Sequence, residues 1–249
     1  MEGHPRVLVV GFPAQAFATN CYVVAVERGA ECIVVDPGVG VERVLAETLR
    51  EHRLKPQAVL LTHGHGDHVA SVTPVCGAYD IPAYLHGDDA YRLSDPFGPG
   101  LRELLRSQLG SAAAAWRQPD DILPLVNGLV VTVAGFEVSV DHAPGHTEGS
   151  VMFRLPSRDP AAEPGAQTCL CGDVLFAGSI GRTDLPGGDH TAMQRSLASK
   201  VLPLRGFLAS RLLGLHGAIA LRGDLHEPLG RLRLGGAGLP GGRRGVDQS

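Results

Sequence analysis

The chain has 249 residues, 44% of them hydrophobic and 19% charged, which is the ordinary composition of a globular protein that buries a substantial core. Its net charge of −4 argues against nucleic acid or an anionic membrane surface as a partner. No apolar run is long enough to span a membrane, and the first residues lack the basic region and long apolar core of a signal peptide.

The first part of the chain alternates strand and helix patterns. Valine-rich runs at 7–10, 21–26 and 32–35 predict strands. Apolar residues then recur at three- and four-residue spacing over 41–49, which predicts one buried helical face. The apolar run 58–61 predicts a further strand, and a histidine-rich loop follows it. This alternation favours a sheet packed under helices.

The middle of the chain returns to strands after an irregular stretch. Residues 86–118 have a helical and irregular pattern that is broken at 95–100. Strands are predicted at 129–133 and 136–140, joined by a tight Ala134-Gly135 turn, and at 151–155 and 168–171. A loop rich in proline, glycine and alanine separates the last two strands.

The sequence changes character after Leu204. Residues 205–249 are rich in glycine and arginine, and they contain no aromatic residue beyond Phe207. Such ends are typically poorly ordered. We therefore predict a domain over residues 1–204 and an atypical C-terminal segment over 205–249.

The cysteines indicate a reducing compartment. Their number is odd, at five, and no two of them form a CxxC pair. Free thiols of this kind are typical of cytosolic proteins. The sequence therefore predicts a cytoplasmic protein.

The loop after residue 61 has the spacing of a metal site. His63 and His65 alternate at the end of a predicted strand, so their side chains can reach one metal ion. Asp67 and His68 begin the next element and can turn toward a neighbouring position. Imidazole and carboxylate ligands suit zinc, iron or manganese. This loop alone cannot complete two coordination shells, so further ligands are expected from later segments.

Two later segments supply ligand candidates. His146 lies in a glycine-flanked turn after the predicted hairpin. Asp173 follows the apolar strand at 168–171. Ligand-bearing loops at the carboxyl ends of strands are the usual place for sites in layered α/β folds.

These motifs resemble the metallo-β-lactamase superfamily, and within it the short bacterial form of glyoxalase II, the hydroxyacylglutathione hydrolases. The resemblance rests on TNCY at 19–22, VDPG at 35–38, THGHGDH at 62–68, HAPGHTEGS at 142–150 and GDVLFAGSIGRTD at 172–184. It implies an α/β fold, an αββα four-layer sandwich, with two zinc ions at the edge of its two sheets. It also implies ligand roles: the first ion is held by His63, His65 and His146, the second by Asp67 and His68, with Asp173 bridging.

The resemblance is incomplete in the C-terminal segment. The family places its last histidine ligand in a PGHG motif, which this sequence lacks, and His216 is the nearest candidate. The loss of pattern after Leu204 suggests the hypothesis of a shifted or alternative reading frame. Arg182 matches a basic position that contacts the glutathione carboxylate in some members. His142 and His190 stand where such sequences have non-ligand residues.

The resemblance implies a hydrolase that attacks a small-molecule thioester, such as an acyl-glutathione, through a metal-bound hydroxide. Asp67 would either ligate the second ion or orient the nucleophile. Metal affinity should fall in mild acid, because ligand histidines must be neutral. Two alternatives stay open: a mononuclear iron persulfide dioxygenase, and an impaired or inactive homologue with a disrupted C-terminus.

Overall fold

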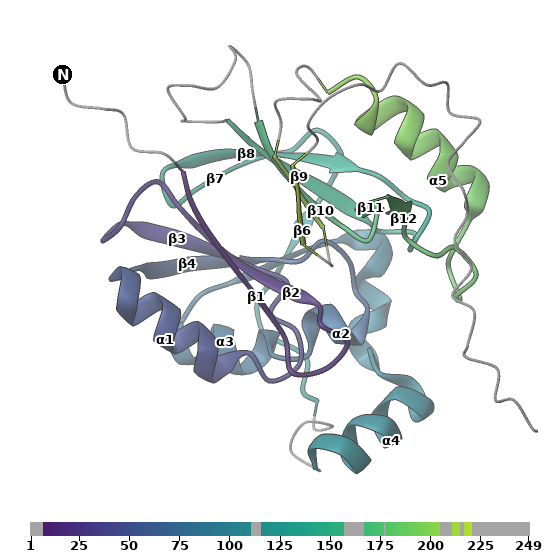
Figure 1. Ribbon diagram of the computed structural model, residues 1–249. Coiled ribbons are helices and arrows are strands. Elements are labelled where there is room, and N and C mark those ends of the chain that lie inside the picture. The colour runs from purple at the N-terminus through teal and green to yellow at the C-terminus, as the bar shows by residue number, and fades with distance from the viewer. Residues whose placement is uncertain are drawn as a thin grey trace, which may run out of the picture.

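The structure, a computed structural model, is a four-layer sandwich. It describes residues 7–110, 116–156, 167–176, 178–204, 211–214 and 217–220. Two six-stranded sheets lie face to face in the centre, and helices cover their outer faces (Figure 1). This is the αββα arrangement that the resemblance implied. Among the described helices, none is long and apolar enough to cross a membrane.

The first sheet is built from the N-terminal half of the chain. Its strands follow chain order: β1 (Leu8–Pro13), β2 (Asn20–Ala25), β3 (Glu31–Val35), β4 (Lys55–Leu60), β5 (Ala83–His86) and β6 (Ile122–Leu125). The first three are antiparallel, and β3 to β6 are parallel. The parallel strands are joined through α1 (Glu42–His52), α2 (Gly66–Val69), α3 (Val72–Tyr79), the 3-10 helix η1 (Gly87–Ser94) and α4 (Gly98–Leu109).

The second sheet is built from later segments. Its order is β14 (Gly217–Ala220), β13 (Arg211–Gly214), β10 (Gln167–Gly172), β9 (Val151–Pro156), β8 (Phe136–His142) and β7 (Val130–Val133). A small hairpin, β11 (Leu175–Phe176) and β12 (Ser179–Ile180), follows β10. Helix α5 (His190–Ser196) and the π-helical turn η2 (Leu197–Val201) lie on the outer face of this sheet (Figure 1).

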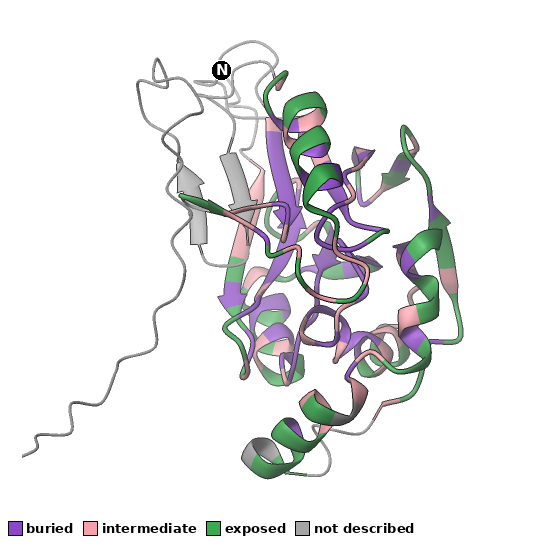
Figure 2. Ribbon diagram, turned by 90° about the vertical axis from the view of Figure 1, so that its right-hand side faces the viewer, coloured by how far each residue is buried: buried purple, intermediate pink, exposed green. Residues whose placement is uncertain are grey.

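Three clusters of buried apolar side chains lie between the four layers of the sandwich and hold them together. One joins α1 and α3 to the first sheet, with Leu45 and Val59 among its members. The second lies between the two sheets and includes Phe153. The third joins α5 to the second sheet through Met193 and Cys171. Figure 2 shows buried strands in the middle and exposed outer helix faces. Cys171 is buried, and all five cysteines are free thiols.

The predicted patterns agree with most of these elements. The stripe over 41–49 forms the buried face of α1, where Leu45 and Leu49 are both buried. Ala134 and Gly135 adopt positive φ values of 49° and 75°, which matches the twist of a tight hairpin. The break at 95–100 separates η1 from α4. The sequence analysis missed β5 and β6, because both are four residues long and β6 contains Pro124.

Part of the predicted C-terminal segment extends the second sheet. Strand β13 pairs parallel to β10, and β14 pairs antiparallel to β13. The paired edge of β10 is thereby covered. His216 and the rest of the segment lie outside the described residues. The predicted boundary after residue 204 stays a prediction.

Candidate metal centre

Three loops from both sheets meet at one end of the sandwich. The loop with His63 and His65 follows β4, the loop with His146 follows β8, and Asp173 follows β10. The two sheets touch here, because the backbone N–H of Val151 donates to the carbonyl of Thr62 at 2.8 Å. Residues far apart in the sequence are therefore gathered by strand ends.

The first ligand group consists of His63, His65 and His146. One ligand atom of each lies within 4.8 Å of the others. The Nδ1 atom of His65 is 2.9 Å from Nε2 of His146, so these two nitrogens share a proton when no metal is bound. The structure thus brings together the three histidines that the sequence predicted for a first metal ion.

The second ligand group consists of His63, His68 and Asp173. Asp173 lies between the two groups: its Oδ1 is 3.2 Å from Nε2 of His68, and its Oδ2 is 3.4 Å from Nε2 of His146. That placement suits the predicted bridging ligand. The Oδ2 atom of Asp67 is 3.6 Å from Nε2 of His68 and accepts a 2.9 Å hydrogen bond from the Thr19 hydroxyl. Asp67 therefore borders the second group, and its role as a ligand stays a prediction.

The donor atoms of this centre fit a cation. Among the described residues, Nε2 of His63 is buried without a hydrogen-bond partner, and Nε2 of His68 and Oδ1 of Asp173, which lie 3.2 Å apart, have no partner beyond each other. A buried polar atom left in this way costs about 1–3 kcal/mol. Metal coordination satisfies such atoms at once, and imidazole with carboxylate suits zinc, iron or manganese.

Asp36 fixes the orientation of His68. Its carboxylate accepts hydrogen bonds from the Thr62 backbone at 2.8 Å, from the Thr62 hydroxyl at 2.7 Å and from Nδ1 of His68 at 3.0 Å. With Nδ1 occupied, the Nε2 atom of His68 faces Asp173. In the sequence, Asp36 is noted only as part of the VDPG motif at 35–38 and is given no role at the site. Its place after the buried strand β3, beside β4, is the signal that could have identified it.

Asp89 anchors the two histidine loops to one another. This fully buried carboxylate accepts hydrogen bonds from the backbone N–H groups of Gly64 and Gly149, each at 2.8 Å, and from the Thr147 hydroxyl at 2.7 Å. It also lies 3.3 Å from the Arg92 guanidinium. Sequence reasoning missed Asp89, because nothing in its local pattern distinguishes it from its exposed neighbour Asp88.

Two glycines permit close approaches at the centre. A Cβ at Gly66 would lie 2.5 Å from Cδ1 of Phe97, so crowding requires a glycine at this position. Gly172 has a φ of 49°, and a Cβ there would lie 2.4 Å from Oγ1 of Thr62. A side chain at either position would displace a residue next to a ligand loop.

Arg182 serves the centre through its backbone. Its carbonyl oxygen lies 2.8 Å from Nδ1 of His146, which directs Nε2 of that ring toward Asp173. The Arg182 side chain is exposed and pairs with Asp184 through two 2.7 Å contacts. Its hydrogen bond lowers the pKa of Asp184 to about 2.

Known proteins place the chain in a family. The model described as the metallo-beta-lactamase superfamily matches residues 14–211. The chain belongs to this superfamily. An uncharacterised protein of Mycobacterium tuberculosis is 40% identical over 202 residues, which are 80% of this chain and 86% of that protein. Hydroxyacylglutathione hydrolase GloC of Haemophilus influenzae is 30% identical over 198 residues, covering 77% of this chain and 83% of GloC.

Solved structures of the superfamily agree with this fold. The BLEG-1 B3 metallo-beta-lactamase aligns with a TM-score of 0.67 and 34% identity, over 84% of this chain and 92% of its own. TTHA1623 in a di-iron-bound form aligns with a TM-score of 0.63 and 34% identity, over 85% and 94%. The family and the two ligand groups together indicate a metal-dependent hydrolase.

The two ligand groups differ in charge when no metal is bound. Burial lowers the pKa of His63, and burial together with His146 lowers the pKa of His65 to about 4. Burial opposes the charge of His68 as well, but Asp67 and Asp173 outweigh it and raise the pKa of His68. Without a metal, His68 therefore keeps its proton to higher pH than His63 and His65 do.

Zinc binding to the second group should consequently release a proton from His68. A ligand imidazole must be deprotonated, so a raised pKa makes protons compete with the metal and lowers affinity as pH falls. Calorimetric titrations in two buffers of different ionisation enthalpy should give different heats for the wild type. The difference should shrink in His68→Gln. Equal wild-type heats in both buffers would contradict a protonated His68.

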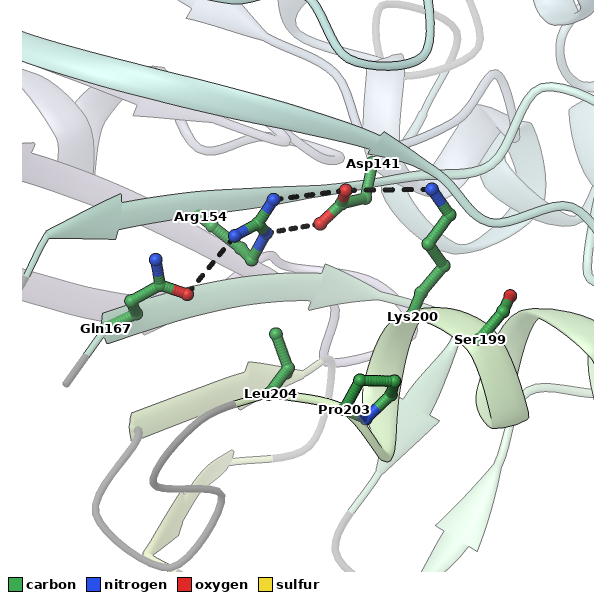
Figure 3. Close-up of a pocket in the computed structure, with 7 residues that line it drawn as sticks. All are labelled: Asp141, Arg154, Gln167, Ser199, Lys200, Pro203 and Leu204. Carbon is green, nitrogen blue, oxygen red and sulfur yellow. Dashed lines mark hydrogen bonds and ion pairs between the residues drawn. The ribbon is translucent and has the colours of Figure 1, made fainter. Parts of the chain in front are cut away.

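A separate pocket of about 500 Å³ lies beside β8, β9 and η2, away from the superfamily metal centre. Figure 3 shows the Arg154 guanidinium and the Lys200 ammonium converging on the Asp141 carboxylate. The Arg154 guanidinium also donates a hydrogen bond to Oε1 of Gln167. These contacts tie three elements of the second sheet together, and we assign the pocket a structural role.

Proposed function

We propose that the protein hydrolyses a thioester, with an acyl-glutathione as substrate, at a centre for two metal ions. The observation that carries this proposal is the pair of ligand groups that share His63 and have Asp173 between them. The relative GloC, named as a hydroxyacylglutathione hydrolase, supports the substrate class. Zinc is the metal we expect, and the di-iron form of TTHA1623 makes iron the first alternative to test.

The residues of the chain would divide the work as follows. Bound metal ions supply an activated water and polarise the substrate carbonyl. His68, held by Asp36, and His146, held by the Arg182 carbonyl, present fixed nitrogens to that chemistry. The Thr19 hydroxyl holds Asp67 beside His68. There the Asp67 carboxylate can either bind the second metal ion or orient the attacking water. A thiolate can leave without a protein acid, so a thioester substrate requires no dedicated general acid at this centre.

The second ligand group favours the hydrolase over the mononuclear iron dioxygenase alternative. A single ion at the first group would leave His68, which Asp36 orients toward Asp173, without a ligand role. The impaired homologue stays an alternative, because His216, the predicted last ligand, lies outside the described residues. Metal content per chain, oxygen consumption with glutathione persulfide, and the gain in melting temperature on adding zinc test these alternatives in turn.

The decisive assay uses the purified full-length chain, loaded with zinc or iron. We expect loss of the thioester absorbance of an acyl-glutathione, with release of one thiol per turnover. A coenzyme A thioester and a chromogenic cephalosporin serve as parallel substrates, the latter because of the likeness to BLEG-1. A metal-loaded protein that cleaves the cephalosporin but no thioester would overturn the proposal, as would one inert to every substrate.

Arg182→Ala tests whether the substrate carries an anionic carboxylate near this side chain. We expect KM for the acyl-glutathione to rise about threefold to tenfold, because one exposed charge contact is lost. The kcat should stay within about twofold, since the backbone carbonyl that orients His146 is retained. Arg106→Ala, in an exposed ion pair on α4, is the matched control. An unchanged KM would show that Arg182 does not contact the substrate.

A further inference from the structure

A second set of metal-binding side chains lies outside the centre described above. His86 ends β5, Asp88 lies in the first turn of η1, and His142 ends β8. One ligand atom of each lies within 4.8 Å of the other two. The set thus combines both sheets, and none of its members belongs to the two ligand groups of the candidate metal centre.

The two rings stack, and the carboxylate lies beside them. The imidazoles of His86 and His142 have centroids 4.0 Å apart and an angle of 11° between their planes. The Oδ2 atom of Asp88 is 3.6 Å from Nδ1 of His86 and 3.9 Å from Nε2 of His142, which is too long for hydrogen bonds. The backbone N–H of Asp88 donates to Nδ1 of His86 at 3.3 Å. A shared ion would replace that hydrogen bond, and one ring would turn out of the stack, because an ion lies in the plane of each imidazole that binds it.

A backbone oxygen adds a fourth donor. The Glu148 carbonyl lies 2.7 Å from Nε2 of His142. Without a metal, a proton on Nε2 joins these two atoms. A cation in contact with both would replace that proton, as it does at any imidazole ligand. Two nitrogens with carboxylate and carbonyl oxygens favour zinc, nickel or copper(II) over calcium or magnesium, which select oxygen.

The set is accessible from solvent. The Asp88 side chain is 59% exposed and that of His142 is 24% exposed, while His86 is buried behind them. An ion can therefore enter, Asp88 can swing toward it, and water can fill the remaining positions. His86 and His142 lie at strand ends, so their backbones are held in place while the rings and the Asp88 side chain can turn toward an ion.

We propose that His86, Asp88 and His142 form a separate surface site for a divalent transition-metal ion such as Zn²⁺. An ion there would contact the loop that carries His146, because Glu148 belongs to that loop. It would also adjoin Asp89, which holds the same loop through Gly149. Occupation of the site should therefore raise the melting temperature of the protein.

The test is zinc stoichiometry by equilibrium dialysis and metal analysis of the full-length chain. We expect His142→Gln and Asp88→Asn each to bind one ion per chain fewer than the wild type at micromolar zinc. His190→Gln, which alters an exposed histidine outside both centres, should match the wild type. As a second readout, copper(II) added to the zinc-loaded wild type should give an electron paramagnetic resonance signal with nitrogen coupling, and Asp88→Asn should weaken it.

Asp88→Asn keeps the proposal falsifiable if His142→Gln fails to fold, because Asp88 is exposed. Equal zinc stoichiometry in the wild type and Asp88→Asn, together with an unchanged copper signal, would overturn the proposal. In that case the three side chains form an ordinary polar cluster around two stacked rings. None of these variants alters the candidate metal centre, so ions bound there should contribute equally to the zinc stoichiometry of the wild type and of each variant.

Discussion

Replacing Asp173 by asparagine should remove nearly all hydrolytic activity and leave the fold intact. The carboxylate lies between the two ligand groups, 3.2 Å from His68 and 3.4 Å from His146. An amide has the same shape but carries no charge to hold two cations. We expect kcat/KM to fall by at least about 100-fold, with at least one metal ion per chain lost.

Circular dichroism and metal analysis distinguish a damaged site from a damaged fold in this variant. Asp120→Asn is the matched control, because the Asp120 side chain is 81% exposed and lies just before β6, far along the chain from the ligand loops. It should retain wild-type activity and metal content. An Asp173→Asn protein with normal stoichiometry and activity would show that Asp173 bridges nothing.

Asp89→Ala should give the largest loss of stability of any single substitution at the centre. Removal of this carboxylate leaves the N–H groups of Gly64 and Gly149 and the Thr147 hydroxyl without their acceptor, and it leaves Arg92 without one of its partners. Breaking a buried charged network in this way costs about 3–5 kcal/mol. The midpoint of thermal unfolding should fall by roughly 10 °C or more.

Urea unfolding of the metal-free protein measures this effect without a contribution from bound ions. Asp120→Ala should change the free energy of unfolding by less than about 0.5 kcal/mol, as exposed substitutions do. Asp89→Asn should fall between the two, because its amide oxygen can still accept part of the network. A loss below about 1 kcal/mol in Asp89→Ala would refute the anchoring role.

The layered fold could be predicted because its signals are local. Valine-rich runs mark β2 and β3, and one apolar stripe marks the buried face of α1. The short parallel strands β5 and β6 carry no comparable signal. Their strand geometry depends on pairing with β4 and with each other, which a local window does not contain.

The ligands of the centre could be predicted from the sequence, but the carboxylates that position the ligands could not. His63, His65 and His68 are close in sequence, and Asp173 ends a recognisable strand. Asp36 and Asp89, in contrast, accept hydrogen bonds from ligand-loop residues 25 to 60 positions away. Only the sheet order brings those carboxylates to the histidine loops. The ligands of a site can thus be predicted from local motifs, whereas the residues that position those ligands can be identified only once the order of the strands is known.

The contact between Thr62 and Gly172 has a mechanical meaning for the whole sandwich. A bare backbone at Gly172 lets the end of β10 rest against Thr62 of the other sheet, and the next residue on each side of this contact is a ligand, His63 or Asp173. The candidate metal ligands therefore follow directly on the point of closest approach between the two sheets, so a larger side chain at Gly172 would alter the packing of the sheets and the spacing of these ligands together.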